Sequence, residues 1–230
     1  MNKINQVEKR YGATVVLSID VLTIYPGETI GLVGNNGVGK TTLFSLMLDL
    51  IKPHTGNILI NEIDVSQSEE WKAFMGAYVS ENFLIDYLTP DEYFSFIAGL
   101  HNWNSNDLSN FLNWFHEFFN DEIIGKKKYI RDLSKGNQKK VGIVGALIGD
   151  PEFIILEEPF ANLAPTTQSR LIGLINDLKS EEKTILISSH DLTNVTEVSS
   201  RFIVLEKGHL VKDINKSDTA LEELKGYFEV

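Results

Sequence analysis

A glycine-rich segment near the N-terminus constrains the fold of this chain more than any other feature. Residues 34–41 read GNNGVGKT, a full match to the pattern G-x-x-x-x-G-K-[S/T]. The apolar run 29–33 precedes it, and an apolar stretch of helical character, residues 41–51, follows and stops before Pro53. In this order of strand, loop and helix, backbone N–H groups converge at a helix N-terminus and attract phosphate groups. The segment therefore predicts a sheet with a phosphate-binding loop at the end of one strand.

The loop and the first turn of the helix after it supply the residues that we expect to bind nucleotide phosphates: Gly34, Asn35, Asn36, Gly37, Val38, Gly39, Lys40, Thr41 and Thr42. Lys40 would reach the β- and γ-phosphates, and the Thr41 hydroxyl would ligate Mg²⁺. The alternative interpretation is a glycine-rich turn with a chance lysine. That alternative leaves the flanking strand and helix unexplained.

Short apolar runs between turn residues predict further strands. They lie at 14–18, at 55–65 as a pair around Asn61, at 77–80, at 153–159, at 184–190, and at 201–211 as a hairpin around Lys207 and Gly208. Apolar residues at helical spacing predict helices at 90–100, 105–120, 133–149, 166–180 and 192–200, and one amphipathic helix after Lys216. Strands and helices alternate except in a helical block between them. The sequence therefore predicts an α/β protein with a helical subdomain.

The apolar strand at 153–159 carries two adjacent carboxylates near its end, Glu157 and Glu158. In an open α/β sheet, ligands bind at the carboxyl ends of the strands, and this edge also carries the phosphate-binding loop. One carboxylate would hold the water shell of a metal, and its neighbour could polarise an attacking water. From this segment alone, a solvated glutamate pair ending a strand remains an open alternative.

Composition and charge exclude several classes of protein. The chain has 32 acidic and 21 basic residues, a net charge of −11, whereas a phosphate backbone attracts positive charge. We therefore expect no nucleic-acid partner. There is no cysteine to form a disulfide or a thiolate metal site, and no window approaches the about 20 uncharged apolar residues that cross a bilayer. Because the first residues lack an apolar segment, we expect an intracellular protein.

Further motifs make the chain resemble a known family. The segment LSKGNQ, which contains Ser134, resembles the LSGGQ signature of the ATP-binding subunits of ATP-binding cassette (ABC) transporters, and Ser134 lies 94 residues after Lys40. Glu158 follows Ser134 by 24 residues, and His190, within ISSHD, follows Glu158 by 32. Tyr11, within KRYG, matches the aromatic residue that stacks on adenine in the family. The order and the separations of these motifs are similar to those of the family.

The resemblance covers about residues 3–212 and implies a single ABC ATPase domain over residues 1–230. Its fold is α/β, with a P-loop NTPase core, a mixed β-sheet and a helical subdomain. The implied division is a nucleotide-binding core at 1–87 and 150–215, a helical subdomain at 88–149 and a C-terminal tail at 216–230.

The same resemblance implies an ATPase with ATP and Mg²⁺ at its site. Glu158 would be the general base, and His190 would contact the γ-phosphate and the attacking water. Thr41, Glu81 and Glu157 would lie on the metal side of the site. The family usually has Asp at position 157 and Gln at position 81, although similar members that work with separately encoded permeases carry Glu at the latter.

The signature segment implies partners. Ser134 would cap a helix whose free N–H groups, together with Gly136, face the γ-phosphate held by another subunit. ATP would therefore join two subunits head to tail, the second being another copy or a homologous ATPase subunit. An integral-membrane permease would complete the transporter and hold this chain at the cytoplasmic face of the membrane. The permease would insert a short helix into a groove, and Phe83, Leu84, Tyr87 and Leu88 are the candidates to line it. The alternative is that these four side chains are buried in ordinary apolar packing.

A non-enzymatic alternative stays open at this stage. Ala164 stands where the family has an aspartate that links the two sites across the dimer, and Glu157 stands in place of the usual metal-side aspartate. The alternative is an ATP-gated binding module in which ATP closes the dimer and hydrolysis is vestigial. Action on ribosomes or DNA is a third option, which the single cassette, the absence of a long coiled-coil insert and the negative charge disfavour.

Overall fold

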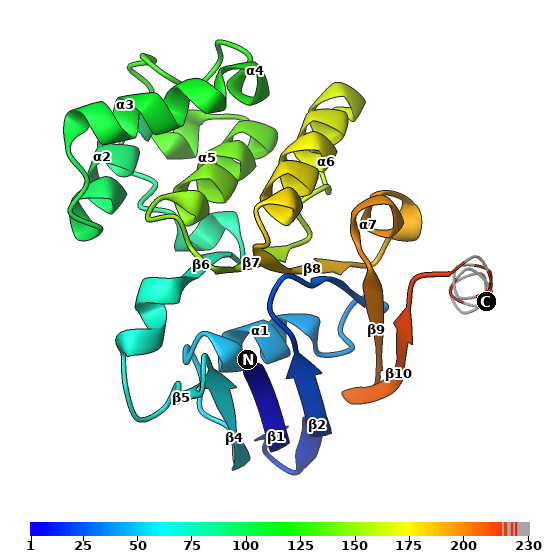
Figure 1. Ribbon diagram of the computed structural model, residues 1–230. Coiled ribbons are helices and arrows are strands. Elements are labelled where there is room, and N and C mark those ends of the chain that lie inside the picture. Colours follow the sequence, from blue (N-terminus) through cyan, green and yellow to red (C-terminus); the bar gives the residue numbers. More distant parts are fainter. Residues whose placement is uncertain (218, 220–221, 223, 225–230) are drawn as a thin grey trace.

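The computed structural model describes residues 1–217, 219, 222 and 224 (Figure 1). The helix expected after Lys216 falls largely on residues outside this set. Over the described part of the chain one sheet has ten strands in the order β5-β4-β1-β2-β10-β9-β3-β8-β7-β6. The strands are β1 (Asn2–Tyr11), β2 (Thr14–Ile24), β3 (Thr29–Val33), β4 (Thr55–Ile60), β5 (Ile63–Asp64), β6 (Met75–Tyr78), β7 (Phe153–Glu157), β8 (Thr184–Ser189), β9 (Arg201–Glu206) and β10 (His209–Asn215).

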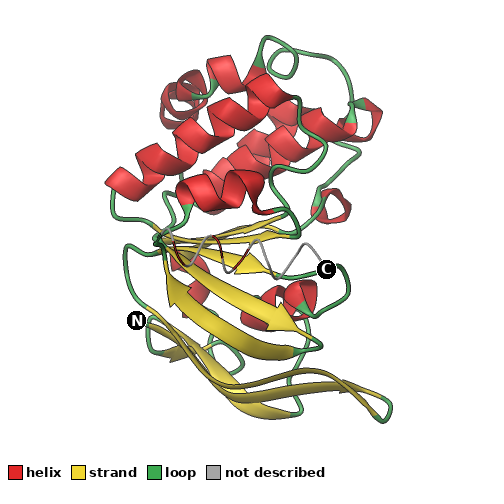
Figure 2. Ribbon diagram, turned by 90° about the vertical axis from the view of Figure 1, so that its right-hand side faces the viewer, coloured by secondary structure: helices red, strands yellow, loops and turns green. Residues whose placement is uncertain are grey.

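Helices cover the sheet, and four of them gather above one end of it (Figures 1 and 2). The α-helices are α1 (Lys40–Met47), α2 (Pro90–Leu100), α3 (Ser105–Trp114), α4 (His116–Phe119), α5 (Lys135–Leu147), α6 (Pro165–Ser180) and α7 (Leu192–Val198), and the 3₁₀ helices are η1 (Glu70–Phe74), η2 (Glu81–Phe83) and η3 (Ile130–Asp132). The four that gather are α2 to α5. Among the described residues, none of the helices has the length and apolar character needed to cross a bilayer.

The sheet is mixed, as predicted. Strand β3 pairs in parallel with both β8 and β9, whereas β1 pairs antiparallel with β2 and β4. Every residue of β3, β7 and β8 is buried, as expected for parallel strands covered on both faces. In β7, Ile154 and Leu156 join a core shared with helices α2 to α6, whereas Phe153 and Ile155 join a second core with α1 and the antiparallel strands. The parallel strands thus separate two hydrophobic cores.

The sequence did not reveal strand β1, and it gave β2 too short. In β1 the buried residues Ile4 and Val7 stand three apart, because Gln6 between them takes a positive φ of 46°. In β2 the adjacent residues Asp20 and Val21 are both exposed. Each irregularity breaks the alternation of period two by which a strand is recognised.

Two helices end earlier than their apolar pattern predicts. Helix α1 ends at Met47 rather than near residue 51, because Asp49 adopts the left-handed conformation that terminates helices. The single helix expected at 105–120 is divided into α3 and α4 at Phe115, whose backbone (φ −95°, ψ 7°) leaves the helical region. The division directs the side chain of Phe115 towards the hydrophobic core, where it is only 2% exposed.

Helix α5 lies unusually close to its neighbours. A Cβ atom on Gly142 would approach the Tyr78 ring to 2.4 Å, and one on Gly145 would approach the Tyr93 ring to 2.7 Å. On the facing strand, a Cβ atom on Gly76 would lie 1.9 Å from the carbonyl oxygen of Ala146. Real Cβ atoms do not approach so closely. Glycine at these three positions therefore allows the helix to pack directly on β6 and α2.

Candidate functional site

The phosphate-binding loop connects β3 to α1 at the carboxyl edge of the sheet. Gly37 and Gly39 both have positive φ, 81° and 111°, and Gly39 is the residue that directly precedes α1. A Cβ atom on Gly34 would lie 2.4 Å from the carbonyl oxygen of Leu205, so β9 packs directly against the loop. The Val38 carbonyl accepts a hydrogen bond from the Gly208 N–H at 2.9 Å. The loop conformation thus depends on glycine and on support from the β9–β10 hairpin.

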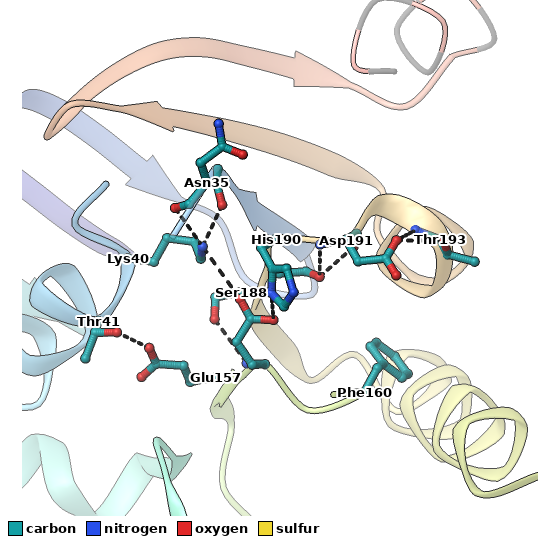
Figure 3. A network of polar contacts seen from close by, with 12 residues as sticks. Asn35, Lys40, Thr41, Glu157, Phe160, Ser188, His190, Asp191 and Thr193 are labelled. Atoms are coloured by element: carbon teal, nitrogen blue, oxygen red, sulfur yellow. Dashed lines mark hydrogen bonds and ion pairs between the residues drawn. The ribbon is translucent and has the colours of Figure 1, made fainter. Parts of the chain in front are cut away.

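Lys40 is folded back over this loop. Its Nζ atom donates hydrogen bonds to the carbonyl oxygens of Gly34 at 2.6 Å and Asn35 at 3.3 Å, and lies 3.6 Å from Oε1 of Glu158 (Figure 3). The side chain is 6% exposed. Burial lowers the pKa of Lys40, while the charge of Glu158 favours the protonated form. The ammonium group therefore lies between the loop carbonyls and a carboxylate, where its charge would attract an anion bound in the loop.

Thr41 and Glu157 are joined directly. The Thr41 hydroxyl donates a hydrogen bond to Oε1 of Glu157, as Figure 3 shows. Glu157 is 9% exposed, and its Oε2 atom is buried with no hydrogen-bond partner. Burial raises the pKa of Glu157, the Thr41 hydrogen bond opposes this shift, and the charge of Glu158 adds to it. A buried carboxylate with a free oxygen beside a hydroxyl fits Mg²⁺, which takes few protein oxygens and completes its shell with phosphate and water oxygens.

Glu81, the third residue expected on the metal side, starts η2 after strand β6. Burial raises the pKa of the neighbouring Tyr78, and the charge of Glu81 and its hydrogen bond with Tyr78 raise it further. The cavity lined by Thr41 and Glu157 does not include Glu81. The described residues also contain no cluster of three His, Asp or Glu side chains that could hold a metal. A metal here would therefore depend on oxygen ligands from a nucleotide.

Glu158 and His190, the two expected catalytic residues, are in contact. Oε2 of Glu158 lies 2.8 Å from Nδ1 of His190. Glu158 has a positive φ of 44°, and its N–H donates to the carbonyl oxygen and to Oγ of Ser188, at 3.2 and 3.1 Å. The His190 side chain is 46% exposed. A partly accessible carboxylate paired with an exposed imidazole has the geometry required of a general base.

One cavity of about 360 Å³ brings together most residues expected to bind a nucleotide. It is lined by Tyr11, Val16, Asn36, Gly37, Gly39, Lys40, Thr41, Thr42, Glu157 and Glu158. Tyr11 is 57% exposed and offers its ring at the mouth, with the Lys9 ammonium 5.5 Å from the ring centroid. Gly34, Asn35 and Val38 belong to the loop but do not line this cavity.

The signature residues lie elsewhere. Oγ of Ser134 accepts a hydrogen bond from the Asn137 N–H at 3.2 Å and so caps α5. Ser134 and Gly136 line a second cavity of about 700 Å³, together with Ala164, Lys140 and Arg170 among others, and this cavity shares no residue with the phosphate loop. Within one chain the structure therefore does not bring Ser134 and Gly136 to the other nucleotide-binding residues.

The four candidates for a groove divide into two pairs. Phe83 and Tyr87 are 60% and 63% exposed. Leu84 and Leu88 are partly buried against the hydrophobic core that includes α2 and α5. Packing thus accounts for the two leucines, whereas the two aromatic side chains are free to meet another molecule.

Sequence reasoning missed Lys139. It is 4% exposed, and its Nζ atom donates a hydrogen bond to the carbonyl oxygen of Glu158 at 2.6 Å. Ser188, near the end of β8, was also missed, because it and Lys139 contact the backbone of Glu158 and such contacts have no sequence motif. The only signal for Lys139 is a lysine within the small-residue stretch that forms α5, and such a lysine is normally assigned to solvent.

Comparison with known proteins decides the family. A family model described as "ABC transporter" matches residues 17–161, well over half of the chain. The chain belongs to the ABC transporter family. The family match covers the phosphate loop, the signature segment and the two adjacent carboxylates Glu157 and Glu158.

Related sequences support this membership. An uncharacterised ABC transporter ATP-binding protein of Nostoc sp. is 37% identical over 207 residues, which make up 89% of this chain and 60% of the relative. A second uncharacterised one, of Methanocaldococcus jannaschii, is 32% identical over 91% of this chain and 75% of the relative. The ABC transporter ATP-binding protein NatA of Bacillus subtilis is 32% identical over 83% of this chain and 78% of its own length. The chain thus spans 60 to 78% of the length of these three ABC relatives.

Solved structures agree on the ABC fold. An ATP-binding subunit of an ABC transporter superposes with a TM-score of 0.88 at 24% identity, and the match covers 100% of both chains. The structure of cbiO1 from Clostridium perfringens, described as part of an ABC transporter complex, gives a TM-score of 0.78 at 26% identity, over 96% of this chain and 91% of that one. The prediction of an α/β ABC ATPase fold with a mixed sheet and a helical subdomain is confirmed.

Proposed function

We propose that this chain binds and hydrolyses ATP and thereby powers a membrane ABC transporter. One observation carries the proposal: a single cavity joins an exposed aromatic ring, a phosphate-binding loop and two carboxylates at the end of a buried strand. The loop and the ring suit the phosphates and the base of a nucleotide, and the carboxylates suit a metal and a water molecule.

ATP would bind with its adenine on Tyr11 and its phosphates in the loop. Lys40, now bound to the carbonyls of Gly34 and Asn35, would turn its ammonium group to the β- and γ-phosphates. Thr41 and Glu157 would hold Mg²⁺, which neutralises phosphate charge when it is bound. The unpartnered Oε2 of Glu157 supports this assignment, because a buried carboxylate oxygen without a partner is costly unless a ligand satisfies it.

Hydrolysis would begin with a water molecule beside Glu158. The Glu158 carboxylate accepts the proton of the water as the oxygen of that water attacks the γ-phosphorus, and the bond from the γ-phosphorus to the β–γ bridging oxygen breaks. His190, 2.8 Å from the carboxylate, orients it and contacts the γ-phosphate. Lys40, 3.6 Å from the same carboxylate, holds it beside the phosphate-binding loop before ATP binds.

The active assembly would be a head-to-tail dimer with a second copy or a homologous subunit. Ser134 and Gly136 lie on a cavity separate from the phosphate loop, so they can contact the γ-phosphate only on another subunit. We assign the nucleotide-binding core to residues 1–87 and 150–215, the helical subdomain to 88–149 and a tail to 216–230.

The transporter would also need a membrane partner. Relatives include NatA, a bacitracin transport ATP-binding protein of Enterococcus faecalis and cbiO1, described as part of the cbiONQ complex. By analogy, a separately encoded integral-membrane permease would hold this chain at the cytoplasmic face of the membrane. The exposed Phe83 and Tyr87 are the proposed contacts for a helix of that permease.

An ATP-gated module without hydrolysis is the second candidate. It is favoured by Ala164, which offers no carboxylate to link the two sites of a dimer, and by Glu157, which already bonds to Thr41. Phosphate release from Mg²⁺-ATP by the purified chain, measured with and without its permease, separates the two functions. Release above background supports the ATPase, whereas nucleotide binding without any release in either condition supports the module.

ATP binding itself is tested with Lys40→Ala. Removal of the ammonium group should weaken ATP at least tenfold, or about 1.4 kcal/mol, in a fluorescence titration. Affinity equal to that of the parent would contradict the assignment of the loop. A matched control is Lys72→Ala, whose lysine lies on η1, outside both the phosphate loop and the nucleotide cavity.

A further inference from the structure

We infer that Lys139 positions the general base by fixing the backbone of Glu158, an inference that rests on the proposed ATPase function. Lys139 lies on α5, outside the nucleotide cavity, and belongs to none of the sequence motifs of the site. Its Nζ atom donates a hydrogen bond to the carbonyl oxygen of Glu158 at 2.6 Å. A charged donor at this distance makes one of the stronger hydrogen bonds available to a main-chain carbonyl.

Glu158 needs such support because its backbone is strained. Its φ of 44° lies in the left-handed region, which is unfavourable for a residue with a Cβ atom. The peptide group before Glu158 is held by Ser188, which accepts from the Glu158 N–H through both its carbonyl oxygen and Oγ. The peptide group after it is held by Lys139. Together these bonds fix the two dihedral angles that direct the carboxylate towards His190 and Lys40.

The surroundings of Lys139 hold its ammonium group in place. Its side chain is 4% exposed, and its ammonium group lies 5.8 Å from the centroid of the Tyr78 ring. Burial lowers the pKa of Lys139, and the negative charges of Glu81, Glu158 and Glu157 oppose this shift only in part. A buried ammonium group is costly unless its charge is compensated, and the Glu158 carbonyl, the Tyr78 ring and the attraction of these carboxylates offset that cost.

The hydrogen bond from Lys139 to the Glu158 carbonyl makes helix α5 one of the elements that hold the general base in place. Ser134 caps the same helix five residues earlier, so the signature segment and the support of Glu158 share one rigid element. Lys139 touches no reacting atom in this arrangement and acts only through Glu158. It is therefore a positioning residue, and its loss should affect turnover rather than nucleotide binding.

The test compares Lys139→Met, which keeps an unbranched side chain without the ammonium donor, with Lys139→Arg, which keeps a charged donor. Because small displacements of a catalytic group can cost up to about a hundredfold, Lys139→Met should lower kcat at least tenfold and change KM for ATP less than about twofold. Lys139→Arg should restore most of kcat. Lys183→Met is the matched control, since Lys183 also bonds to a carbonyl, that of Asp150, but away from the site, and it should retain the parent rate.

A double-mutant cycle shows whether Lys139 acts through Glu158. In a Glu158→Gln background, Lys139→Met should change the residual rate less than about twofold, because the base is already absent. A parent-like kcat in Lys139→Met, or an equal loss in both backgrounds, would overturn the positioning role. If Glu158→Gln alone keeps the parent rate, the base assignment itself is wrong and the inference falls with it. If Lys139→Met does not fold, Lys139→Leu, which also lacks a donor, replaces it with the same expected loss of kcat.

Discussion

The general base offers the sharpest test of the site, through Glu158→Gln. Glutamine keeps the length of the side chain and can still hydrogen-bond to His190, which lies 2.8 Å from Oε2 of Glu158. It cannot accept the proton of an attacking water. General bases contribute about 10²- to 10⁴-fold, so turnover should fall at least about a hundredfold, or about 2.7 kcal/mol of barrier.

In Glu158→Gln, ATP should bind at least as tightly as in the parent, although turnover falls. The parent holds Lys40 in an ion pair with Glu158 at 3.6 Å, and ATP must compete for that ammonium group. With the Glu158 side chain 24% exposed, this pair contributes up to about 1 kcal/mol. Its removal should leave the Kd for ATP unchanged or lower it by up to about fivefold. The ATP-bound dimer should also last longer, because its phosphate bridge is no longer cleaved.

The assay measures Mg²⁺-dependent phosphate release at saturating ATP, and Kd by fluorescence titration on the same preparations. Glu158→Asp is the matched control, since it keeps a carboxylate and withdraws it by about 1.5 Å. That variant should lose rate by displacement alone and should release phosphate faster than Glu158→Gln. A parent rate that survives in Glu158→Gln would refute the assignment of the base.

Three further expectations follow from the same geometry. Tyr11→Ala should weaken ATP binding by about 1–3 kcal/mol, the range for stacking of bases on aromatic rings. An unchanged Kd for ATP would mean that Tyr11 does not stack on adenine. Glu157→Asp should leave phosphate release unchanged or raise it, because the shorter carboxylate leaves Thr41 free for the metal, and a large loss would mean that the longer side chain is required. Asp191 caps α7, and its side-chain and backbone hydrogen bonds with Thr193 hold the pKa of Asp191 below its usual range. The contribution of Asp191 to stability is therefore complete above about pH 4 and lost as the pH falls through the lowered pKa. In Asp191→Ala, the free energy of unfolding measured with urea should accordingly fall less steeply as the pH is lowered below about 4.

The sequence predicts the parts of the site that are local. The phosphate loop is contiguous and needs only its own glycines and the flanking strand and helix, so its residues were recognisable directly. The contact between Glu158 and His190 joins residues far apart in the chain, yet both end buried parallel strands, and such ends meet at one edge of the sheet. Family resemblance then assigned their roles.

What the sequence could not predict depends on tertiary contacts. Strand β1 is hidden because Gln6 shifts the alternation of its buried residues. The division at Phe115 arises because burial of that ring is worth more than one continuous helix. Lys139 is buried because the carbonyl of Glu158 and the ring of Tyr78 receive its ammonium group, and a lysine in a helix gives no local sign of such contacts.

The glycines of α5 also have a consequence for the order in which the molecule folds. Three of the 13 residues of this helix, Gly136, Gly142 and Gly145, each disfavour a helix by about 1 kcal/mol relative to alanine. A segment of this length is marginal even with good helix formers, so α5 would not persist in a chain that lacks the sheet. It gains its stability when Gly142 and Gly145 close on the rings of Tyr78 and Tyr93. Helix α5 therefore forms as it docks, after β6 and α2 have offered a surface to receive it.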